Sequence, residues 1–336
     1  MRFTWAATGL ALREPFRISR SVMTEREAVT ITAEHEGVAG HGEVVTSVYY
    51  GLDVSRIEEE LEAAQRQLAG RTPDEALVGE LPAVSAGVRA GLDAALHDLV
   101  ARMRGVPVHE LVGAALRQPV PTARTIGIVP TARAVAAAGD LTRRGFQVLK
   151  IKLAGGADEI ARLAAIREVA PDARLLLDPN GAWEVAEAKR MLSAAAEFEV
   201  DAVEQPIAPG HPDLLAEVAE SSPVPVIADE DARSAEDVRR LGSRVHGVNV
   251  KLPECGGIRA AREIIDTARG FGVEVMLGCQ VASSLGIAPA VHLSGLARWV
   301  DLDGHLLLSR DPWTGLGGEN GLLRIAGDVG LGVHPS

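Results

Sequence analysis

Charged residues recur at intervals of 22 to 26 residues through the middle of this 336-residue chain. Each follows a short apolar run, and the positions are Lys150 with Lys152, Asp178, Glu204, Asp229 and Lys251. One β-strand with its following helix occupies about that length, so the charges fall at equivalent places in a repeating βα unit. Because the carboxyl ends of parallel barrel strands meet at one mouth, we expect these side chains to lie together.

The carboxylates of this set predict a metal site. Asp178, Glu204 and Asp229 would come from neighbouring strands, and three such charges repel each other unless a cation neutralises them. No His or Cys joins them, so we expect a hard ion, Mg²⁺, completed by water or substrate oxygens. Asn180 and Glu230 stand next to the expected ligands, where they could orient them.

The lysines of the set predict proton transfer. Lys150 and Lys152 are two residues apart on one strand, so both point to the same side, and Lys251 lies four strands further on. A nearby divalent cation lowers the pKa of a lysine toward neutrality, which suits a general base. Two lysines on opposite sides of one carbon could remove a proton from one face and return it to the other, while the metal holds the enolate oxygens.

Lysine is rare in this chain, which makes its placement informative. Only four of the 34 basic residues are lysines, and three of the four stand at expected strand ends. Arginine keeps its proton, whereas lysine can be tuned to release it. We therefore interpret these three positions as needing a removable proton, and we expect the fourth, Lys189, on a helix surface.

The apolar runs predict the element order of a barrel. They cover residues 122–126, 148–153, 174–178, 201–204, 224–229, 247–252, 274–277 and 298–302. A helix-compatible segment follows each of the first seven runs, which indicates a parallel sheet with right-handed crossovers. We interpret residues 117–303 as a modified TIM (β/α)-barrel of the α/β class. The alternative is an open doubly wound sheet, which the missing GxGxxG pattern disfavours.

The first 116 residues predict an α+β capping domain. Strands are expected over residues 5–12, 28–36 and 39–45, with a turn at Glu36–Gly37, and helices over 54–69, 82–104 and 108–112. Polar loops over residues 19–27 and 47–53 are expected to close over a ligand. The glycine-rich segment 304–336 is expected to return and pack on this domain.

Composition excludes several classes of protein. The net charge is −12 and the pI is about 5.3, which argues against nucleic acid or an anionic membrane as a partner. The two cysteines form no CxxC motif, which favours a reducing cytoplasm over a disulfide framework. No uncharged apolar stretch is long enough to predict a membrane span.

The motifs, taken in order, resemble those of the enolase superfamily. They are KIKLAGG, LLLDPNGAW, VEQPI, PVIADED, VNVKLPECGG, MLGCQVASSLGIAPAVHLS and DLDG, and they look most like the muconate-lactonizing branch. That branch includes dipeptide epimerases, muconate cycloisomerases, o-succinylbenzoate synthases and N-acylamino acid racemases. The resemblance implies a barrel with a capping domain, Lys152 and Lys251 as the acid/base pair, Lys150 stabilising the carboxylate or enolate, and a carboxylate-bound Mg²⁺.

Asp301-x-Asp303 favours one member of that branch. In the dipeptide epimerases this pair holds the free α-ammonium of the substrate, and two inward carboxylates without a metal favour a cation. Muconate and succinylbenzoate are anions that would be repelled. The resemblance therefore implies a Mg²⁺-dependent dipeptide epimerase that inverts the Cα of the second residue. A cycloisomerase, synthase or N-acylamino acid racemase of the branch stays open, as does a non-catalytic binding protein on this fold.

Substrate selection is expected to depend on the loops. Arg20, Arg26, Tyr49 and Tyr50 are candidate contacts from the capping domain, and Cys279 is expected to form a small pocket wall. No His is placed by the sequence to activate that thiol, so we do not expect a nucleophile. We expect a homo-oligomer, as relatives commonly are, acting on a small-molecule dipeptide.

Ala282, His41 and the Pro253-Glu254 pair depart from the family pattern, and only a packing effect is expected from His41, which replaces a common Trp. Ala282 stands where many relatives carry Glu, which leaves the shape and charge of the substrate pocket open. Pro253-Glu254 replaces a Met-Lys-type pair after Lys251, so the electrostatics beside that lysine are expected to differ.

Overall fold

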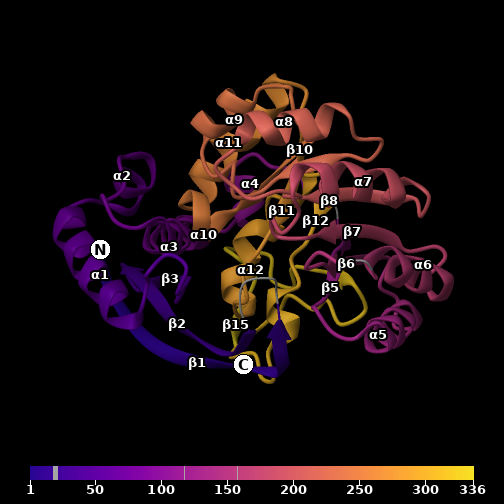
Figure 1. The fold of residues 1–336 in the computed structure, drawn as a ribbon. Helices are drawn as coiled ribbons and strands as arrows, with labels where there is room; N and C mark the ends of the chain where they lie inside the picture. The colour runs from indigo at the N-terminus through magenta and orange to yellow at the C-terminus, as the bar shows by residue number, and fades with distance from the viewer. Residues whose placement is uncertain (18–21, 117, 157) are drawn as a thin grey trace.

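The computed structural model describes residues 1–17, 22–116, 118–156 and 158–336, so Arg20 lies outside the described residues. An eight-stranded parallel sheet curls into a nearly closed barrel with helices around it, and a three-stranded antiparallel sheet with its own helices lies at one side (Figure 1). The predicted fold class is confirmed. Within the described ranges, no helix combines the length and apolarity needed to cross a membrane.

The barrel strands follow one another in chain order. They are β5 (Ala123–Ile126), β6 (Val148–Lys152), β7 (Arg174–Asp178), β8 (Val200–Glu204), β9 (Val226–Ala228), β10 (Gly247–Lys251), β11 (Glu274–Gly278) and β12 (Trp299–Val300). The outer helices are α5 (Thr131–Arg143), α6 (Glu159–Val169), α7 (Val185–Ala196), α8 (Pro212–Glu220), α9 (Ala235–Leu241), α11 (Ile258–Gly270) and α12 (Ser284–Val291). Short helices α10 (Leu252–Cys255), η1 (Ser294–Leu296) and η2 (Gly304–Leu307) fill the connections. Each predicted apolar run overlaps one of these strands, and the ends differ by at most two residues.

Strand alternation separates an apolar barrel floor from a charged mouth. Inward side chains near the strand starts form one buried cluster: Ala123, Val148, Leu176, Ala202, Ile227, Met276 and Trp299. Two residues further along β6 and β7, the inward side chains are Lys150 and Asp178. The outward side chains, such as Leu149 and Leu177, are buried beneath the helices.

The barrel seam between β5 and β12 is closed by side chains. In the described part of the chain, no backbone ladder joins these two strands. Instead, Leu302 N donates to Thr122 Oγ1 at 2.8 Å, and Thr125 N donates to Asp303 Oδ2 at 2.8 Å. The residues that follow β12 are therefore held in place by hydrogen bonds to the first barrel strand.

The capping domain is built on β1 (Arg2–Arg17), β2 (Val22–His35) and β3 (Val38–Val45). Its helices are α1 (Val54–Leu68), α2 (Pro73–Val78), α3 (Ala86–Arg104) and α4 (Val108–Leu111). The predicted hairpin turn is confirmed, with Glu36 and Gly37 both at positive φ. The loop predicted over residues 19–27 is wrong from residue 22 on, because Val22 and Met23 already pair with the end of β1. The prediction also missed α2, whose Thr72 and Glu75 form a capping box.

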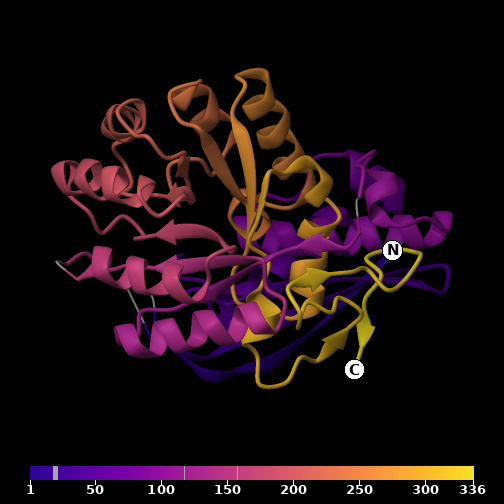
Figure 2. The same cartoon turned by 90° about the vertical axis from the view of Figure 1, so that its right-hand side faces the viewer.

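The C-terminal segment runs between the barrel and the capping domain (Figure 2). Its β14 (Leu322–Leu323) pairs with β4 (Val120–Pro121), and its β13 (Trp313–Thr314) pairs with β15 (His334–Pro335). Leu308 forms an isolated β-bridge with Leu12 of β1, and Gly330 forms another with Pro107, which precedes α4. The predicted domain division at residues 116 and 117 stays a prediction.

Two glycines allow β3 to pack directly against α3. A Cβ at Gly42 would lie 2.0 Å from the backbone oxygen of Gly91, and one at Gly40 would lie 2.2 Å from the nitrogen of Leu99. Backbone atoms of a packed helix cannot move aside as a flexible side chain does.

We expect Gly42→Ala to lower the free energy of unfolding by about 3 kcal/mol, because the added methyl overpacks this contact. The matched control is Gly9→Ala on β1, where a Cβ would meet no atom within 4 Å. Urea unfolding should leave the control unchanged or slightly stabilised. Equal stability of the two variants would contradict this packing account.

Candidate active site

Six of the residues predicted from the sequence meet at the carboxyl ends of the barrel strands. Lys150 and Lys152 lie on β6, Asp178 ends β7, Glu204 ends β8, Asp229 follows β9 and Lys251 ends β10. The three carboxylates are at most 2 % exposed, and the lysine side chains are at most 14 % exposed. A buried group of six charges is unusual, since each charge must be balanced by a neighbour.

The ammonium groups bridge the carboxylates. Lys150 Nζ lies 2.9 Å from Asp178 Oδ2, 2.5 Å from Glu204 Oε2 and 2.8 Å from Asp301 Oδ2. Lys251 Nζ contacts Asp229 Oδ2 and lies 3.8 Å from Glu204 Oε1. The two lysines thus link strands on both sides of the mouth through Glu204.

Lys152 has a separate environment from Lys150. Its Nζ donates to Asp178 Oδ2 at 2.5 Å and to Asn180 Oδ1 at 3.1 Å. Asn180 also donates its backbone N–H to Asp178 Oδ1 at 2.8 Å. Asn180, predicted to orient an expected ligand, therefore contacts both that carboxylate and the lysine beside it.

The carboxylates hold the lysines in their charged form. Burial alone would lower the pKa of Lys150 and Lys251, but the surrounding carboxylates outweigh it and raise both pKa values above the usual range. Burial would raise the pKa of Asp178, yet Lys150 and Lys152 lower it. The lowered lysine pKa expected from the sequence requires a divalent cation at the mouth, which would offset the effect of the carboxylates.

The carboxylate set fits a hard divalent cation in its chemistry. In the arrangement of the described residues, no group of three or more His, Cys, Asp or Glu side chains is poised to hold a metal ion. The bridging lysines lie among the carboxylates, as their contacts show. The donors of Asp178, Glu204 and Asp229 are all oxygen atoms, which matches the preference of Mg²⁺.

Two supporting residues were not predicted. Asn249 of β10 donates to Glu204 Oε1 at 2.7 Å, and Gln205 accepts from Asp229 N at 2.9 Å. Asn249 could have been found from its position two residues before Lys251, which puts both on the inward face. Glu230, which was predicted, is buried beside Asp229, and its carbonyl oxygen accepts from Arg233.

Asp301 and Asp303 differ in their surroundings. Asp301 contacts Lys150 through Oδ2, while its Oδ1 is buried without a hydrogen-bond partner among the residues that the structure describes. Burial, opposed by Lys150 and reinforced by Asp303, raises the pKa of Asp301 to about 6. Asp303 accepts from Arg124 Nη1 at 2.9 Å. The sequence did not reveal that both carboxylates already have basic partners within the protein.

The loop after β11 forms part of the rim. Cys279 is partly exposed, and burial together with the charges of Asp301 and Asp303 raises the pKa of its thiol well above the usual range. A neutral thiol fits the expected wall better than a nucleophile. The neighbouring Ala282 is buried, and Arg26 donates to Val281 O at 3.1 Å, which ties β2 to this loop.

The two tyrosines of the second capping loop lie differently. Tyr50 OH donates to Glu254 Oε2 at 2.8 Å, and Glu254 Oε1 accepts from Gln280 Nε2 at 3.3 Å. Tyr49 is 57 % exposed and meets the Tyr50 ring edge-on, with 4.9 Å between centroids. Tyr50 thus joins the capping domain to the barrel rim, whereas Tyr49 presents its ring to solvent.

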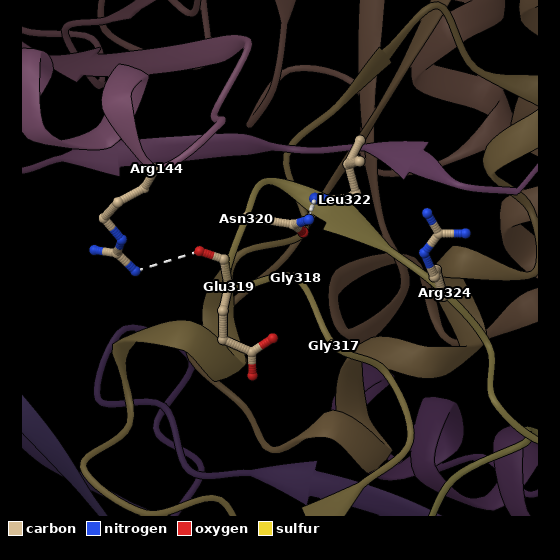
Figure 3. Close-up of a pocket in the computed structure, with 7 residues that line it drawn as sticks. All are labelled: Arg144, Gly317, Gly318, Glu319, Asn320, Leu322 and Arg324. Atoms are coloured by element: carbon tan, nitrogen blue, oxygen red, sulfur yellow. Dashed lines mark hydrogen bonds between the residues drawn. The ribbon is translucent and has the colours of Figure 1, made fainter.

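Other parts of the molecule are separate from this mouth. Lys189 pairs with Glu217 at 2.8 Å on the outer helices, as expected for a surface residue. Figure 3 shows a cavity of about 500 Å³, and one of its lining residues, Arg144, lies between the end of α5 and the start of β6. It is lined by Arg144, Gly317, Gly318, Glu319, Asn320, Leu322 and Arg324, and by none of the predicted site residues.

This fold, with charged side chains at the barrel mouth, defines a class of barrel proteins that carry a separate capping domain. Two family models match the chain and identify that class. Residues 2–113 match the mandelate racemase/muconate lactonizing enzyme N-terminal domain, and residues 132–336 match the enolase C-terminal domain-like family. The chain belongs to the mandelate racemase/muconate lactonizing enzyme family of the enolase superfamily.

Individual relatives share nearly the whole length of the chain. A hydrophobic dipeptide epimerase from Roseobacter litoralis is 34% identical over 99% of this chain and 98% of its own. An L-Ala-D/L-Glu epimerase from Bacteroides thetaiotaomicron is 31% identical over 99% of this chain and 88% of its own. A dipeptide epimerase from Enterococcus faecalis, solved with Mg and L-Leu-L-Tyr, is 29% identical, covers 98% of both chains and has a TM-score of 0.92.

Glu43 of β3 joins the capping domain to α12 and should make stability depend on pH. Its carboxylate accepts from Ser283 N at 2.9 Å and from Ser283 Oγ, and burial raises its pKa from 4.5 to about 7. Since the folded state holds this proton more tightly, its stabilisation is complete below pH 4.5 and declines as the pH rises through 7.

We expect Glu43→Gln to remove this decline, because the amide stays neutral. Relative to wild type, the variant should gain roughly 3 kcal/mol in unfolding free energy between pH 4.5 and 8. Urea unfolding in EDTA at several pH values measures the difference. A difference that does not vary with pH would contradict the titration of Glu43 in this range.

Proposed function

We propose that this protein is a Mg²⁺-dependent dipeptide epimerase that inverts the Cα of the second residue of a dipeptide. One observation carries the proposal: Lys152 of β6 and Lys251 of β10 enter the mouth from well-separated strands, and three carboxylates stand at the carboxyl ends of the three strands between them. The names of the relatives, which are dipeptide epimerases of several specificities, support the same reaction.

Asp178, Glu204 and Asp229 would hold the Mg²⁺, and relatives solved with Mg and a dipeptide support this assignment. When bound there, the ion would neutralise these carboxylates and the charge that develops on the carboxylate of the substrate. Asn180 orients Asp178 through its backbone N–H, and Asn249 donates to Glu204. Gln205 holds the backbone of Asp229, and Glu230 follows it in the chain.

The two lysines would share a 1,1-proton transfer through an enolate. One ε-amine accepts the Cα proton from its side, and the other, as an ammonium, donates a proton to the opposite face. Which lysine acts as base depends on the configuration of the incoming dipeptide. Lys150 would contribute positive charge near the enolate, because its Nζ lies among Asp178, Glu204 and Asp301.

The acidic end of the mouth would select the free α-ammonium of the dipeptide. Asp301 Oδ1 is a buried acceptor with no hydrogen-bond partner among the described residues, so a ligand cation would satisfy it. Asp303 adds negative charge nearby. A dicarboxylate substrate of a muconate cycloisomerase or o-succinylbenzoate synthase, or an N-acylated amino acid, carries no ammonium to place there.

The preferred side chains stay open, because the relatives differ between hydrophobic and acidic dipeptides. Cys279 and Ala282 are proposed to line the side-chain pocket and Tyr49 to cover it, with Arg20 as a further candidate outside the described residues. The cytoplasmic location and the homo-oligomer stay predictions.

A library of L,L-dipeptides incubated with Mg²⁺ in D₂O tests the reaction and its specificity together. We expect deuterium at the Cα of the C-terminal residue and a new diastereomer for a subset of dipeptides, both abolished by EDTA. The same screen includes N-succinyl and N-acetyl amino acids and muconate. Exchange with no dipeptide would refute the proposal, and turnover of an anion alone would favour another member of the branch.

We expect Lys152→Arg and Lys251→Arg to fold and bind Mg²⁺ but to epimerise at least 10³-fold more slowly, since a guanidinium cannot act as the base. Circular dichroism and calorimetric Mg²⁺ titration check folding and binding. The control is Lys189→Arg, which keeps the charge of a surface ion pair and should match wild type. Normal turnover by either site variant would contradict the two-lysine mechanism.

A further inference from the structure

The carboxylate of Glu159 joins two loops at the barrel mouth. Glu159 is the first residue of α6 and is 8 % exposed. Its Oε1 accepts from Ala154 N at 2.7 Å and from Gly155 N at 2.9 Å, in the loop that follows β6. Its Oε2 accepts from Trp183 Nε1 at 3.2 Å, in the loop that follows β7. Both oxygens of this buried carboxylate are therefore engaged, and the two-lysine mechanism gives it no part.

Both of these loops are connected to Lys152. One of them begins directly after this lysine, which is the last residue of β6. The other contains Asn180, whose Oδ1 accepts from Lys152 Nζ at 3.1 Å and which precedes Trp183 by three residues. Glu159 therefore ties the strand that carries Lys152 to the loop that carries one of its hydrogen-bond acceptors.

Packing holds Trp183 in place without help from the carboxylate. Trp183 is 2 % exposed, and its backbone forms a β-bridge with Ile207, which lies beyond the end of β8. A Cβ at Gly155 would lie 4.0 Å from Trp183 Cδ1 and 3.9 Å from Ala182 O, so the loop after β6 lies close to the loop after β7. A change in the Glu159 carboxylate is therefore expected to release the loop after β6 rather than Trp183.

The contacts of Glu159 are confined to one side of the mouth. Within the described part of the chain, its hydrogen bonds reach only the loops after β6 and β7. Lys251 stands on β10, and its ion-pair partners are Asp229 and Glu204. A change at Glu159 should therefore displace Lys152 and leave Lys251 in place.

We propose that Glu159 is a positioning residue that holds Lys152 for proton transfer on one face of the substrate carbon. The inference rests on the proposed function for the reaction itself. Glu159 acts through the two loops that it joins and not on the substrate. Without its carboxylate, the N–H groups of Ala154 and Gly155 lose their fixed acceptor, and the end of β6 becomes less well held. Proton transfer by Lys152 then slows, whereas proton transfer by Lys251 keeps its rate.

Glu159→Gln tests this division, because an amide cannot replace both carboxylate oxygens. If the amide oxygen accepts from Ala154 and Gly155, the amide nitrogen faces the Trp183 N–H, and two donors cannot pair. In D₂O with Mg²⁺, the variant should exchange the Cα proton of one diastereomer roughly tenfold more slowly, the one that Lys152→Ala fails to exchange. The other diastereomer should exchange at the wild-type rate. Equal losses for both diastereomers, or no loss, would overturn the proposal.

A second variant separates the hydrogen bonds from a general loss of structure. The double variant Glu159→Gln/Trp183→Phe should recover part of the lost exchange rate, because no indole donor then faces the amide nitrogen. No recovery would overturn the hydrogen-bond basis of the proposal. Glu217→Gln is the control, because the Glu217 side chain is 54 % exposed and pairs with Lys189 on the outer helices. This control should match wild type for both diastereomers.

Hydrogen exchange of backbone amides needs no substrate and separates this inference from the proposed function. In Glu159→Gln, the amides of Ala154 and Gly155 should exchange faster than in wild type, while residues 47–53 of the capping domain keep their wild-type rates. Unchanged protection of Ala154 and Gly155 would overturn the anchoring role of Glu159. A wild type inactive on every dipeptide would refute the proposed function, and the amide measurement would still decide whether Glu159 anchors the loop.

Discussion

Charge balance at the mouth of the barrel is the constraint on which the rest of this structure depends. Asp178, Glu204 and Asp229 are almost fully buried, and isolated buried carboxylates would cost several kcal/mol each. Lys150 and Lys251 offset that cost by bridging them. The same contacts raise the pKa values of both lysines, so the carboxylates of the mouth also keep these amines protonated. A second cation bound among the carboxylates would neutralise part of their charge and so lower these pKa values.

The scaffold delivers this arrangement through strand geometry and a few buried anchors. An apolar floor fills the barrel below the charges, and side-chain hydrogen bonds close its seam. Two aspartates of α3 attach the capping domain: Asp93 accepts from Ile258 N at 2.6 Å, and Asp98 accepts from His41 N at 2.8 Å and Leu331 N at 2.7 Å. These buried charge-assisted bonds tie the capping sheet, helix α11 and the C-terminal segment into one unit that frames the mouth.

The sequence predicted the periodic parts of the molecule and missed those that depend on side-chain packing. Strand ends bearing Lys152, Asp178 and Glu204 could be found because a βα repeat places equivalent residues at one edge. The pairing of Asp303 with Arg124 could not, since it joins residues 179 positions apart through the curvature of the barrel. The extension of β2 to Val22 was missed because its polar residues look like a loop, although their partners on β1 complete the ladder.

The central claim is that two lysines serve opposite faces of one carbon. Isotope exchange by variants that lack one lysine side chain tests this claim most directly. Lys152→Ala and Lys251→Ala are each incubated in D₂O with Mg²⁺ and one active dipeptide. The L,L and L,D forms of that dipeptide are tested in separate incubations. The account predicts that each variant exchanges the Cα proton of only one diastereomer, that the two variants prefer opposite diastereomers, and that neither produces epimer. Exchange of both diastereomers by one variant would contradict it.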